Sequence, residues 1–179
     1  MLKTYSATSI KTLRGMEGSG YNAYLTRNGK KVALLIDDAS GGPLMFEWLD
    51  TKAQRVQGSF RTYQDEIQTR TMTPEEKLFN EMVVAMPAEK CEYSQSGFSF
   101  PSVEIVADNI VNDALSMKRL VSVLKKKILF TQAKKSGVFS LPLTPENTKR
   151  VQTAADVGQI LNNLPIDEAF FIARSFSAI

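Results

Sequence analysis

Alternating apolar and polar residues in the first third of the chain predict antiparallel strands. Residues 21–27 and 30–37 both alternate, and Asn28-Gly29 between them favours a two-residue hairpin turn because both positions accept positive φ. A loop of this length sets four cross-strand pairs: Arg27 with Lys30, Leu25 with Val32, Ala23 with Leu34 and Tyr21 with Ile36. We therefore expect Val32, Leu34 and Ile36 to share one apolar face.

Two further strands extend this hairpin into a meander. Residues 44–49 alternate, with Leu44, Phe46 and Trp48 pointing inward, and residues 10–16 are expected to pair with 21–27. A four-stranded antiparallel sheet with one apolar face needs a cover from the rest of the chain. Residues 51–72 are polar, and they predict a mobile connection with one edge strand near residues 55–63.

The remainder of the chain predicts helices and a second hairpin. Thr73, Pro74 and Glu76 form a capping box at the start of a helix that Pro87 stops. Its apolar stripe is expected to contain five residues: Leu78, Phe79, Met82, Val83 and Met86. A longer helix over residues 106–127 is expected from an apolar stripe that ends at Ile128. Its members are Ile110, Ala114, Met117, Val121, Leu124 and Ile128.

The last fifty residues follow the same pattern of strands and helices. Residues 128–132 and 138–141 predict a small hairpin, and Thr144-Pro145 opens a helix that ends near Ala155. The final helix is expected either over residues 156–164 or over 166–175. The fold class is therefore α+β, with a meander at 1–60, a connection at 61–72 and a helical segment with a hairpin at 73–179.

Four short segments carry a resemblance to known proteins. LRGMEGSGY at residues 13–21, NGKKVA at 28–33, DDASGGP at 37–43 and KKKILF at 125–130 resemble a group of small bacteriophage-type proteins of unassigned function. This resemblance implies a phage or mobile-element protein that acts in the cytoplasm of a bacterial host. Such proteins often serve in host takeover or counter-defence, and the resemblance transfers no catalytic residue.

The residue types present limit the possible chemistry. The chain contains no histidine and only one cysteine, Cys91, which excludes a Ser-His-Asp triad, a Cys-His pair, an internal disulfide and Cys-rich metal sites. We therefore expect a binding protein without cofactor or metal rather than an enzyme. The main enzymatic alternative is a metal-dependent nuclease that uses Asp37 and Asp38 with Glu47, which alternation places on the same outer face as Asp37.

The loop at residues 37–42 is one candidate site. Asp37 and Asp38 precede Gly41 and Gly42, and glycines allow the close backbone approach that a phosphate cradle needs. The loop lacks the lysine of a P-loop, and no helix is predicted after it. It is therefore interpreted first as a tight strand connection and second as a small-nucleotide site.

Charge is distributed unevenly along the chain. Residues 61–116 carry 4 basic and 10 acidic side chains, whereas residues 117–179 carry 10 basic and 4 acidic ones. Seven cations lie within an 18-residue stretch without acid: Lys118, Arg119, Lys125, Lys126, Lys127, Lys134 and Lys135. These residues predict a solvated helix face, a site for an acidic protein or for nucleic acid phosphates, or a complement to the acidic segment at residues 61–116 of the same chain.

The remaining signals concern location and packing. The first eleven residues, MLKTYSATSIK, lack the apolar segment of a signal peptide, and no apolar run reaches the length of a membrane helix. Five phenylalanines are assigned to core or interdomain packing: Phe98, Phe100, Phe170, Phe171 and Phe176. The leading hypothesis is a phage-encoded factor that binds a host or defence protein, and a nucleic-acid binder using residues 118–135 is the alternative.

Overall fold

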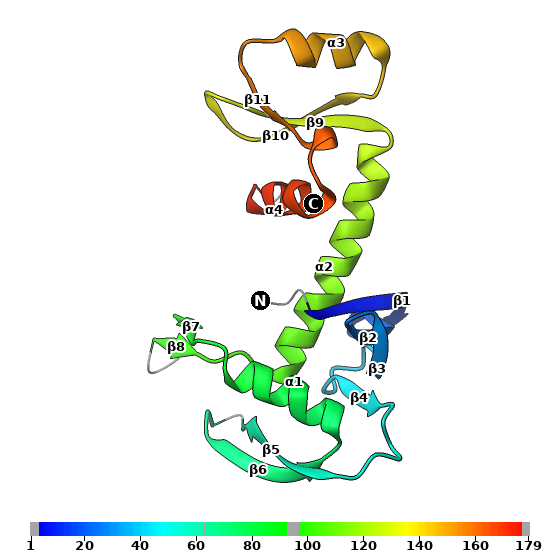
Figure 1. Ribbon diagram of the computed structural model, residues 1–179, viewed down its shortest axis with the longest axis vertical. Helices are drawn as coiled ribbons and strands as arrows, with labels where there is room; N and C mark the ends of the chain where they lie inside the picture. Colours follow the sequence, from blue (N-terminus) through cyan, green and yellow to red (C-terminus); the bar gives the residue numbers. More distant parts are fainter. Residues whose placement is uncertain (1–3, 63, 93–96, 177–179) are drawn as a thin grey trace. The chain divides into compact units, whose positions relative to one another are not determined.

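A computed structural model describes residues 4–62, 64–92 and 97–176 and confirms the α+β prediction (Figure 1). The chain forms two compact units, Met1–Ala114 and Leu115–Ile179. The boundary between the units falls within the long helix α2, Val103–Leu124. Residues 61–72, which we expected to connect two parts of the chain, lie inside the first unit. Each unit has its own sheet.

The first unit is built around a four-stranded antiparallel sheet. Its strands are β1 (Tyr5–Gly15), β2 (Gly18–Arg27), β3 (Lys30–Asp37) and β4 (Met45–Trp48), in the order β1-β2-β3-β4. Asn28 and Gly29 both have positive φ, 51° and 79°, as the predicted two-residue turn requires. The expected meander is therefore confirmed.

A β-bulge in β3 changes the register that alternation predicted. Arg27 pairs with Lys30 as expected, but Leu25 pairs with Ala33, so that Val32 is an extra residue in the strand. Beyond the bulge, Ala33 and Leu35 are fully buried, whereas Leu34 and Ile36 are only half-buried. The predicted apolar face of Val32, Leu34 and Ile36 is wrong because strict alternation cannot anticipate an inserted residue.

The core of the first unit contains a cluster of aromatic rings around Phe79. Helix α1 (Pro74–Val84) carries Phe79, which is fully buried and lies 5.1 Å from the ring of Tyr5. The rings of Phe46 and Trp48 on β4 each lie 6.1 Å from Phe79. The Phe79 side chain thus packs helix α1 against strands β1 and β4.

The predicted capping box at the start of α1 is present. The Thr73 hydroxyl accepts from the Glu76 amide, and the Glu76 carboxylate accepts from the Thr73 amide. The helix ends at Val84, two residues before Met86, and Leu78 of the expected stripe is exposed. Thus Phe79 and Val83 provide the fully buried part of the stripe.

A second hairpin occupies much of the stretch that we expected to be a mobile connection. Strands β5 (Val56–Arg61) and β6 (Ile67–Met72) pair antiparallel, and the predicted position Tyr63 lies outside the described residues. Helix α1 packs closely over this hairpin at Gly58, where a Cβ would lie 3.0 Å from Lys77 Cγ of α1 and 2.6 Å from Met72 Sδ of β6. Glycine at this position permits the close approach.

The first half of α2 also belongs to the core of the first unit. Four of its side chains are buried: Val106, Ala107, Ile110 and Val111. Tyr21 of β2 donates a hydrogen bond to Asp108, and burial followed by this bond raises the pKa of the Tyr21 phenol. The predicted stripe shares only Ile110 with these buried residues. Its last member, Ile128, is buried but lies beyond the end of α2, and its other members are half-buried.

The second unit contains a three-stranded antiparallel sheet. Its strands β9 (Lys127–Gln132), β10 (Lys135–Pro142) and β11 (Val157–Ile160) have the order β10-β9-β11. The predicted hairpin is therefore confirmed, with a third strand added. Helix α3 (Pro145–Thr153) begins at the expected N-cap Thr144, whose hydroxyl accepts from the Asn147 amide.

Apolar side chains cover both faces of the central strand β9. Ile128 and Phe130 pack with Val151 of α3, whereas Leu129 packs with Leu120 of α2 and with a second group of buried residues. That group includes Leu161 in the short 3-10 helix η2 (Leu161–Asn163) and Ala169 in α4 (Ile166–Ser175). A central strand with apolar residues on both faces fits a sheet covered on both sides.

The last helix follows the second of the two predicted alternatives. Helix α4 covers residues 166–175, and the alternative helix over 156–164 is wrong because β11 and η2 occupy that segment. Gly158 explains the difference, since a Cβ there would lie 2.8 Å from Thr131 Oγ1 on β9. Glycine also disfavours a helix interior.

The assignment of five phenylalanines to the core is only partly correct. Phe170 packs against the core of the second unit, and Phe100 is half-buried beneath the guanidinium of Arg61 at 3.7 Å. By contrast, the exposed fractions of Phe98, Phe171 and Phe176 are 49%, 74% and 40%. In α4 the buried positions are filled by Ala169 and Ala173 instead.

Truncation of Phe79 tests the importance of the aromatic cluster. Phe79→Ala leaves a cavity among three rings, and we expect the free energy of unfolding to fall by about 3–5 kcal/mol. Urea unfolding followed by Trp48 fluorescence measures this change. Leu78→Ala, at the neighbouring exposed position, is the matched control and is expected to cost less than about 1 kcal/mol. Equal losses for the two variants would contradict this description of the core.

Candidate functional site

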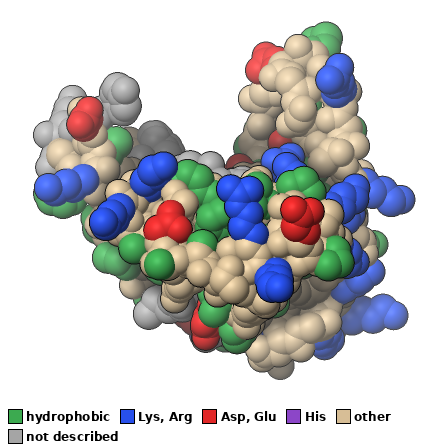
Figure 2. Space-filling model, turned by 90° about the horizontal axis from the view of Figure 1, so that it is seen from above, with side chains coloured by type: hydrophobic (Ala, Val, Ile, Leu, Met, Phe, Trp, Pro, Cys, Tyr) green, Lys and Arg blue, Asp and Glu red, His purple; other side chains and the backbone are tan. Residues whose placement is uncertain are grey.

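All seven cations predicted as a binding region lie in the second unit and are exposed. They occupy three places along the chain: α2 for Lys118 and Arg119, the junction of α2 with β9 for Lys125–Lys127, and the β9–β10 turn for Lys134 and Lys135. None of them forms an ion pair with another described residue. Lys and Arg side chains gather along the right-hand margin of the face drawn in Figure 2.

The cations of α2 follow one side of the helix. The helical hydrogen bonds continue to Lys125, whose amide donates to the Val121 carbonyl at 3.3 Å. With 3.6 residues per turn, Lys118 and Lys125 lie opposite the fully buried Leu120, and Arg119 and Lys126 flank one side of this line. Packing of Leu120 into the core therefore turns the cations outward.

Hydrogen bonds hold the backbone of the three consecutive lysines in place. The Lys126 amide donates to the Val123 carbonyl at 2.9 Å, and the Lys126 carbonyl accepts from the Leu143 amide at 2.9 Å. Lys127 pairs with Pro142 in the ladder between β9 and β10. The lysine side chains therefore extend from a fixed turn rather than from a loose loop.

Asn162 in η2 is the residue that fixes this turn. Its Nδ2 donates to the carbonyls of Leu124 and Lys127 at 3.1 and 2.9 Å, and its Oδ1 accepts from the Leu129 amide at 2.8 Å. One side chain thus satisfies the end of α2 and the start of β9. The sequence alone carried no signal for this role, because the partners lie 33 to 38 residues away.

The lysine-rich turn has an apolar neighbour. Leu143, whose amide bonds the Lys126 carbonyl, is 48% exposed, and Pro142 beside it pairs with Lys127. Exposed apolar area next to charge is typical of surfaces that contact other proteins. A single exposed leucine is common on protein surfaces. Leu143 supports a binding site only because it lies beside the lysines.

The structure separates the predicted basic region into two groups. Lys134 and Lys135 lie at the opposite end of the β9–β10 hairpin from Lys127, roughly 20 Å away at the usual rise per strand residue. Screening in physiological salt acts over about 8 Å, so the two groups act independently. We define the lysine face as Lys118, Arg119, Lys125, Lys126 and Lys127.

Hydrogen bonds within the loop at residues 37–42 support its interpretation as a strand connection. Asp37 Oδ1 accepts from the Ala39 amide at 2.9 Å, and Asp38 Oδ1 accepts from the amide and hydroxyl of Ser40 at 3.0 and 2.6 Å. The hydroxyl bond, followed by the amide bond, lowers the pKa of the Asp38 carboxyl group. Two backbone donors that a phosphate would need are therefore already used.

The same loop packs against the turn between β1 and β2. The Glu17 amide donates to the Ala39 carbonyl at 2.9 Å. A Cβ at Gly41, which has φ +80°, would lie 2.2 Å from Glu17 Oε2. The positive φ of Gly41 favours glycine there, since the flexible Glu17 side chain could move aside, while Gly42 has neither a positive φ nor a comparable close contact.

The predicted carboxylate pair of Asp37 and Glu47 is not formed. Glu47 lies opposite Leu34 in the ladder, and Asp37 is three residues from Leu34, so the two acids lie on opposite faces of the sheet. The bulge at Val32 is not the cause here, since both residues follow it; the pairing of β3 with β4 sets the faces. No group of three potential metal ligands occurs among the described residues.

The acids at the start of α1 are occupied by structural contacts. Both Glu75 carboxylate oxygens accept from Arg27 at 2.8 Å, and Glu76 bonds Arg70 at 2.7 Å in addition to its capping role. These contacts agree with the interpretation of this acidic segment as the start of a helix.

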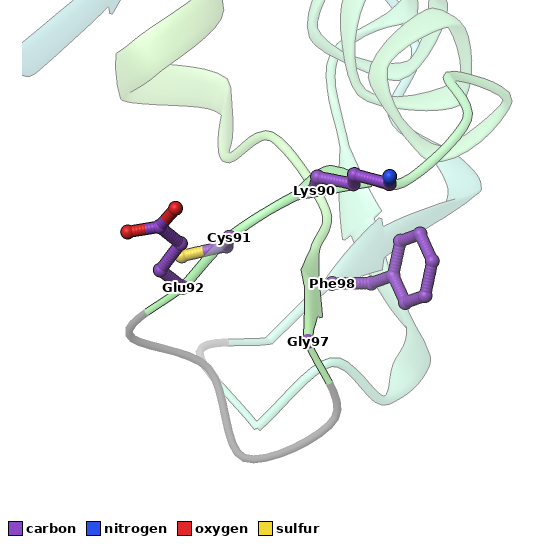
Figure 3. A pocket seen from close by; sticks show the side chains of 5 residues that line it. All are labelled: Lys90, Cys91, Glu92, Gly97 and Phe98. Carbon is purple, nitrogen blue, oxygen red and sulfur yellow. The ribbon is translucent and has the colours of Figure 1, made fainter.

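An open pocket of about 640 Å³ lies beside the hairpin of β7 (Glu89–Lys90) and β8 (Phe98–Ser99). In Figure 3, Lys90 and Phe98 extend to one side of this hairpin, whereas Cys91 and Glu92 extend to the other. The thiol is free and partly exposed. Because these described side chains diverge, they do not form a set of groups that act on one ligand.

The chain matches no protein-family model, no curated protein and no solved structure. Among the described residues, no helix combines the length and the apolar character that crossing a membrane requires.

Removal of the Asn162 side chain tests whether it fixes the lysine-rich turn. Asn162→Ala leaves three backbone groups without their partner, and we expect the free energy of unfolding to fall by about 2–3 kcal/mol. Hydrogen exchange of the Leu129 amide is expected to accelerate most. Asn163→Ala is the control, because Asn163 is exposed and adjacent. Similar exchange rates in both variants would show that Asn162 does not hold the turn.

Ser40→Ala tests the hydrogen bonds of the loop at residues 37–42. Loss of the hydroxyl bond is expected to raise the pKa of Asp38, which carboxyl NMR titration measures directly. Because the folded state favours the charged carboxylate, its stabilising contribution is present above about pH 4 and is lost as pH falls through the lowered pKa. Ser19→Ala should leave the Asp38 titration unchanged, and an unchanged pKa in Ser40→Ala would refute the assignment.

Proposed function

We propose that this chain is a binding protein whose lysine face docks onto an acidic surface of a partner protein. The observation that carries this proposal is the fixed turn of Lys125, Lys126 and Lys127, whose backbone is held by Asn162 and Leu143. The proposal involves no catalytic step and no cofactor.

A fixed backbone matters because exposed charges gain little individually. A surface ion pair contributes about 0.2–1 kcal/mol, and ordering a long side chain offsets part of that gain. Several lysines on a preorganised turn combine these small terms without the additional cost of ordering a loop. A group of exposed positive charges also raises the rate of association with an acidic partner.

Two features favour a protein over a nucleic acid as the partner. Leu143 and Pro142 place apolar area directly beside Lys126 and Lys127. Four of the five cations of the lysine face are lysines, which are less suited than arginine to two-pronged recognition of phosphates and bases. Nucleic acid is the second candidate, favoured by the absence of any acid from residue 118 to residue 135.

The resemblance to small bacteriophage-type proteins adds a biological context to the proposal. In that context the partner is a host or defence protein, and the encounter takes place in the cytoplasm of a bacterial cell. A small-nucleotide site at Gly41 and Gly42 is less well supported, because Asp37 and Asp38 already occupy the amides of Ala39 and Ser40.

Charge reversal tests the proposal with a matched control. Lys125→Glu with Lys126→Glu changes the lysine face, and Lys134→Glu with Lys135→Glu makes the same change in charge at the far end of the hairpin. We expect the first variant to bind a labelled Asp- and Glu-rich peptide at least about tenfold more weakly, and the second to change little. Fluorescence anisotropy in physiological salt measures both.

Two outcomes would contradict the proposal. Equal losses in the two variants would mean that only net charge matters and that the lysine face is no distinct site. Tighter binding of a labelled DNA duplex than of the peptide, with an affinity that falls steeply with salt and is lost in the first variant, would favour the nucleic-acid alternative. Capture from nuclease-treated bacterial lysate with the same two variants then identifies the partner.

A further inference from the structure

A small cavity in the first unit has the features of a ligand site. It has a volume of about 200 Å³ and lies where β4, β6, α1 and the start of α2 meet. Eight residues from these four elements line it: Phe46, Trp48, Arg70, Glu76, Phe79, Asn80, Val103 and Glu104. It is separate from the lysine face and does not depend on the function proposed above.

One part of the lining is aromatic. The rings of Phe46 and Trp48 lie 5.9 Å apart with an angle of 15° between their planes, so they are nearly parallel. Both rings are half-buried, and the fully buried Phe79 lies 6.1 Å from each. The faces of aromatic rings carry partial negative charge and attract cations, with tryptophan the strongest.

The other part of the lining is polar, and two of its groups are already paired. Glu76 is 8% exposed; its Oε1 accepts from Arg70 at 2.7 Å and its Oε2 accepts from the Thr73 amide at 3.3 Å. The charge of Arg70 is thereby neutralised within the lining. This pair contributes shape to the cavity and leaves its net charge unchanged.

The groups that remain for a ligand are acceptors. Asn80 is 5% exposed; its Nδ2 donates to the Glu76 carbonyl at 2.8 Å, while its Oδ1 accepts none of the hydrogen bonds described. Glu104 is half-buried and forms no ion pair with another described residue. The lining therefore has one net negative charge, from Glu104, together with an amide oxygen that accepts no hydrogen bond from the other described residues.

Size limits the ligand further. A cavity of about 200 Å³ holds roughly six or seven waters, each with a share of about 30 Å³. That space suits the end of an alkylammonium or alkylguanidinium group and is too small for a whole nucleotide. A cation there would meet aromatic faces, the Glu104 carboxylate and the Asn80 oxygen together.

We infer that this cavity binds a small organic cation, an alkylguanidinium or alkylammonium group. The cation packs against Trp48 and Phe46, pairs with Glu104 and donates to Asn80 Oδ1. The group is carried either by a free molecule or by a basic side chain of a peptide, since both present the same chemistry.

Trp48 is the only tryptophan of the chain, so its fluorescence reports directly on the cavity. Agmatine serves as the free probe, and a blocked glycine-rich peptide with one central arginine serves as the side-chain probe. The same peptide with citrulline, which is neutral and nearly isosteric, is the control. Sodium chloride keeps the ionic strength constant throughout the titration.

We expect a saturable change in Trp48 emission with at least one cationic probe and about tenfold weaker binding of the citrulline peptide. Saturation by agmatine alone indicates a free molecule, and saturation by the arginine peptide indicates a side chain. No saturable change with either cation, or equal binding of the citrulline peptide, would overturn the inference.

Two variants and one control locate the binding. Glu104→Gln removes the charge and is expected to weaken binding about tenfold, and Val103→Phe is expected to block it by filling the cavity. Glu81→Gln is the control, because Glu81 lies on α1 outside the lining and pairs with Lys77. Unchanged affinity in both folded cavity variants would refute the inference, and neither result affects the test of the lysine face.

Discussion

The carbonyl groups at the end of a helix need hydrogen-bond partners, and this requirement organises the second unit. The Asn162 side chain meets it by bonding the carbonyls of Leu124 and Lys127, while its own oxygen accepts from Leu129. One amide thus joins α2, β9 and η2. The negative end of the helix dipole also favours cations at this junction, so the same electrostatics that stabilise the turn account for three lysines in a row. Structure and charge at this site therefore have a common physical origin.

Local signals in the sequence were sufficient for many elements of the fold and insufficient for the sites. The Asn28-Gly29 turn and the Thr73 capping box depend on residues within a few positions of one another, and both are present. The bulge at Val32 was missed because Val32 and Ala33 are both apolar and a run of apolar residues does not reveal an insertion. The Asn162 contacts and the cavity beside Trp48 join segments that are far apart in the chain, and no periodicity reports such contacts.

The two candidate sites have opposite charge and belong to different units. The lysine face is cationic and unpaired by other described residues, whereas the cavity of the first unit has one net negative charge. The uneven charge along the sequence, with an acidic middle and a basic end, agrees with this division. The acidic middle and the basic end cancel each other in the total, so the net charge of +3 for the whole chain describes neither site.

The extra residue at Val32 changes which positions of β3 are buried and therefore which of them can accept a polar side chain. Val32 itself is 2% exposed, and beyond it Ala33 and Leu35 are the fully buried residues, whereas Lys30 before the bulge is exposed. A polar residue introduced at Leu35, which simple alternation from Val32 would assign to the outer surface, would instead enter a fully buried position. Loss of one residue at this point would reverse the inward and outward sets of everything that follows in the strand, so the length of β3 is constrained as strictly as its composition.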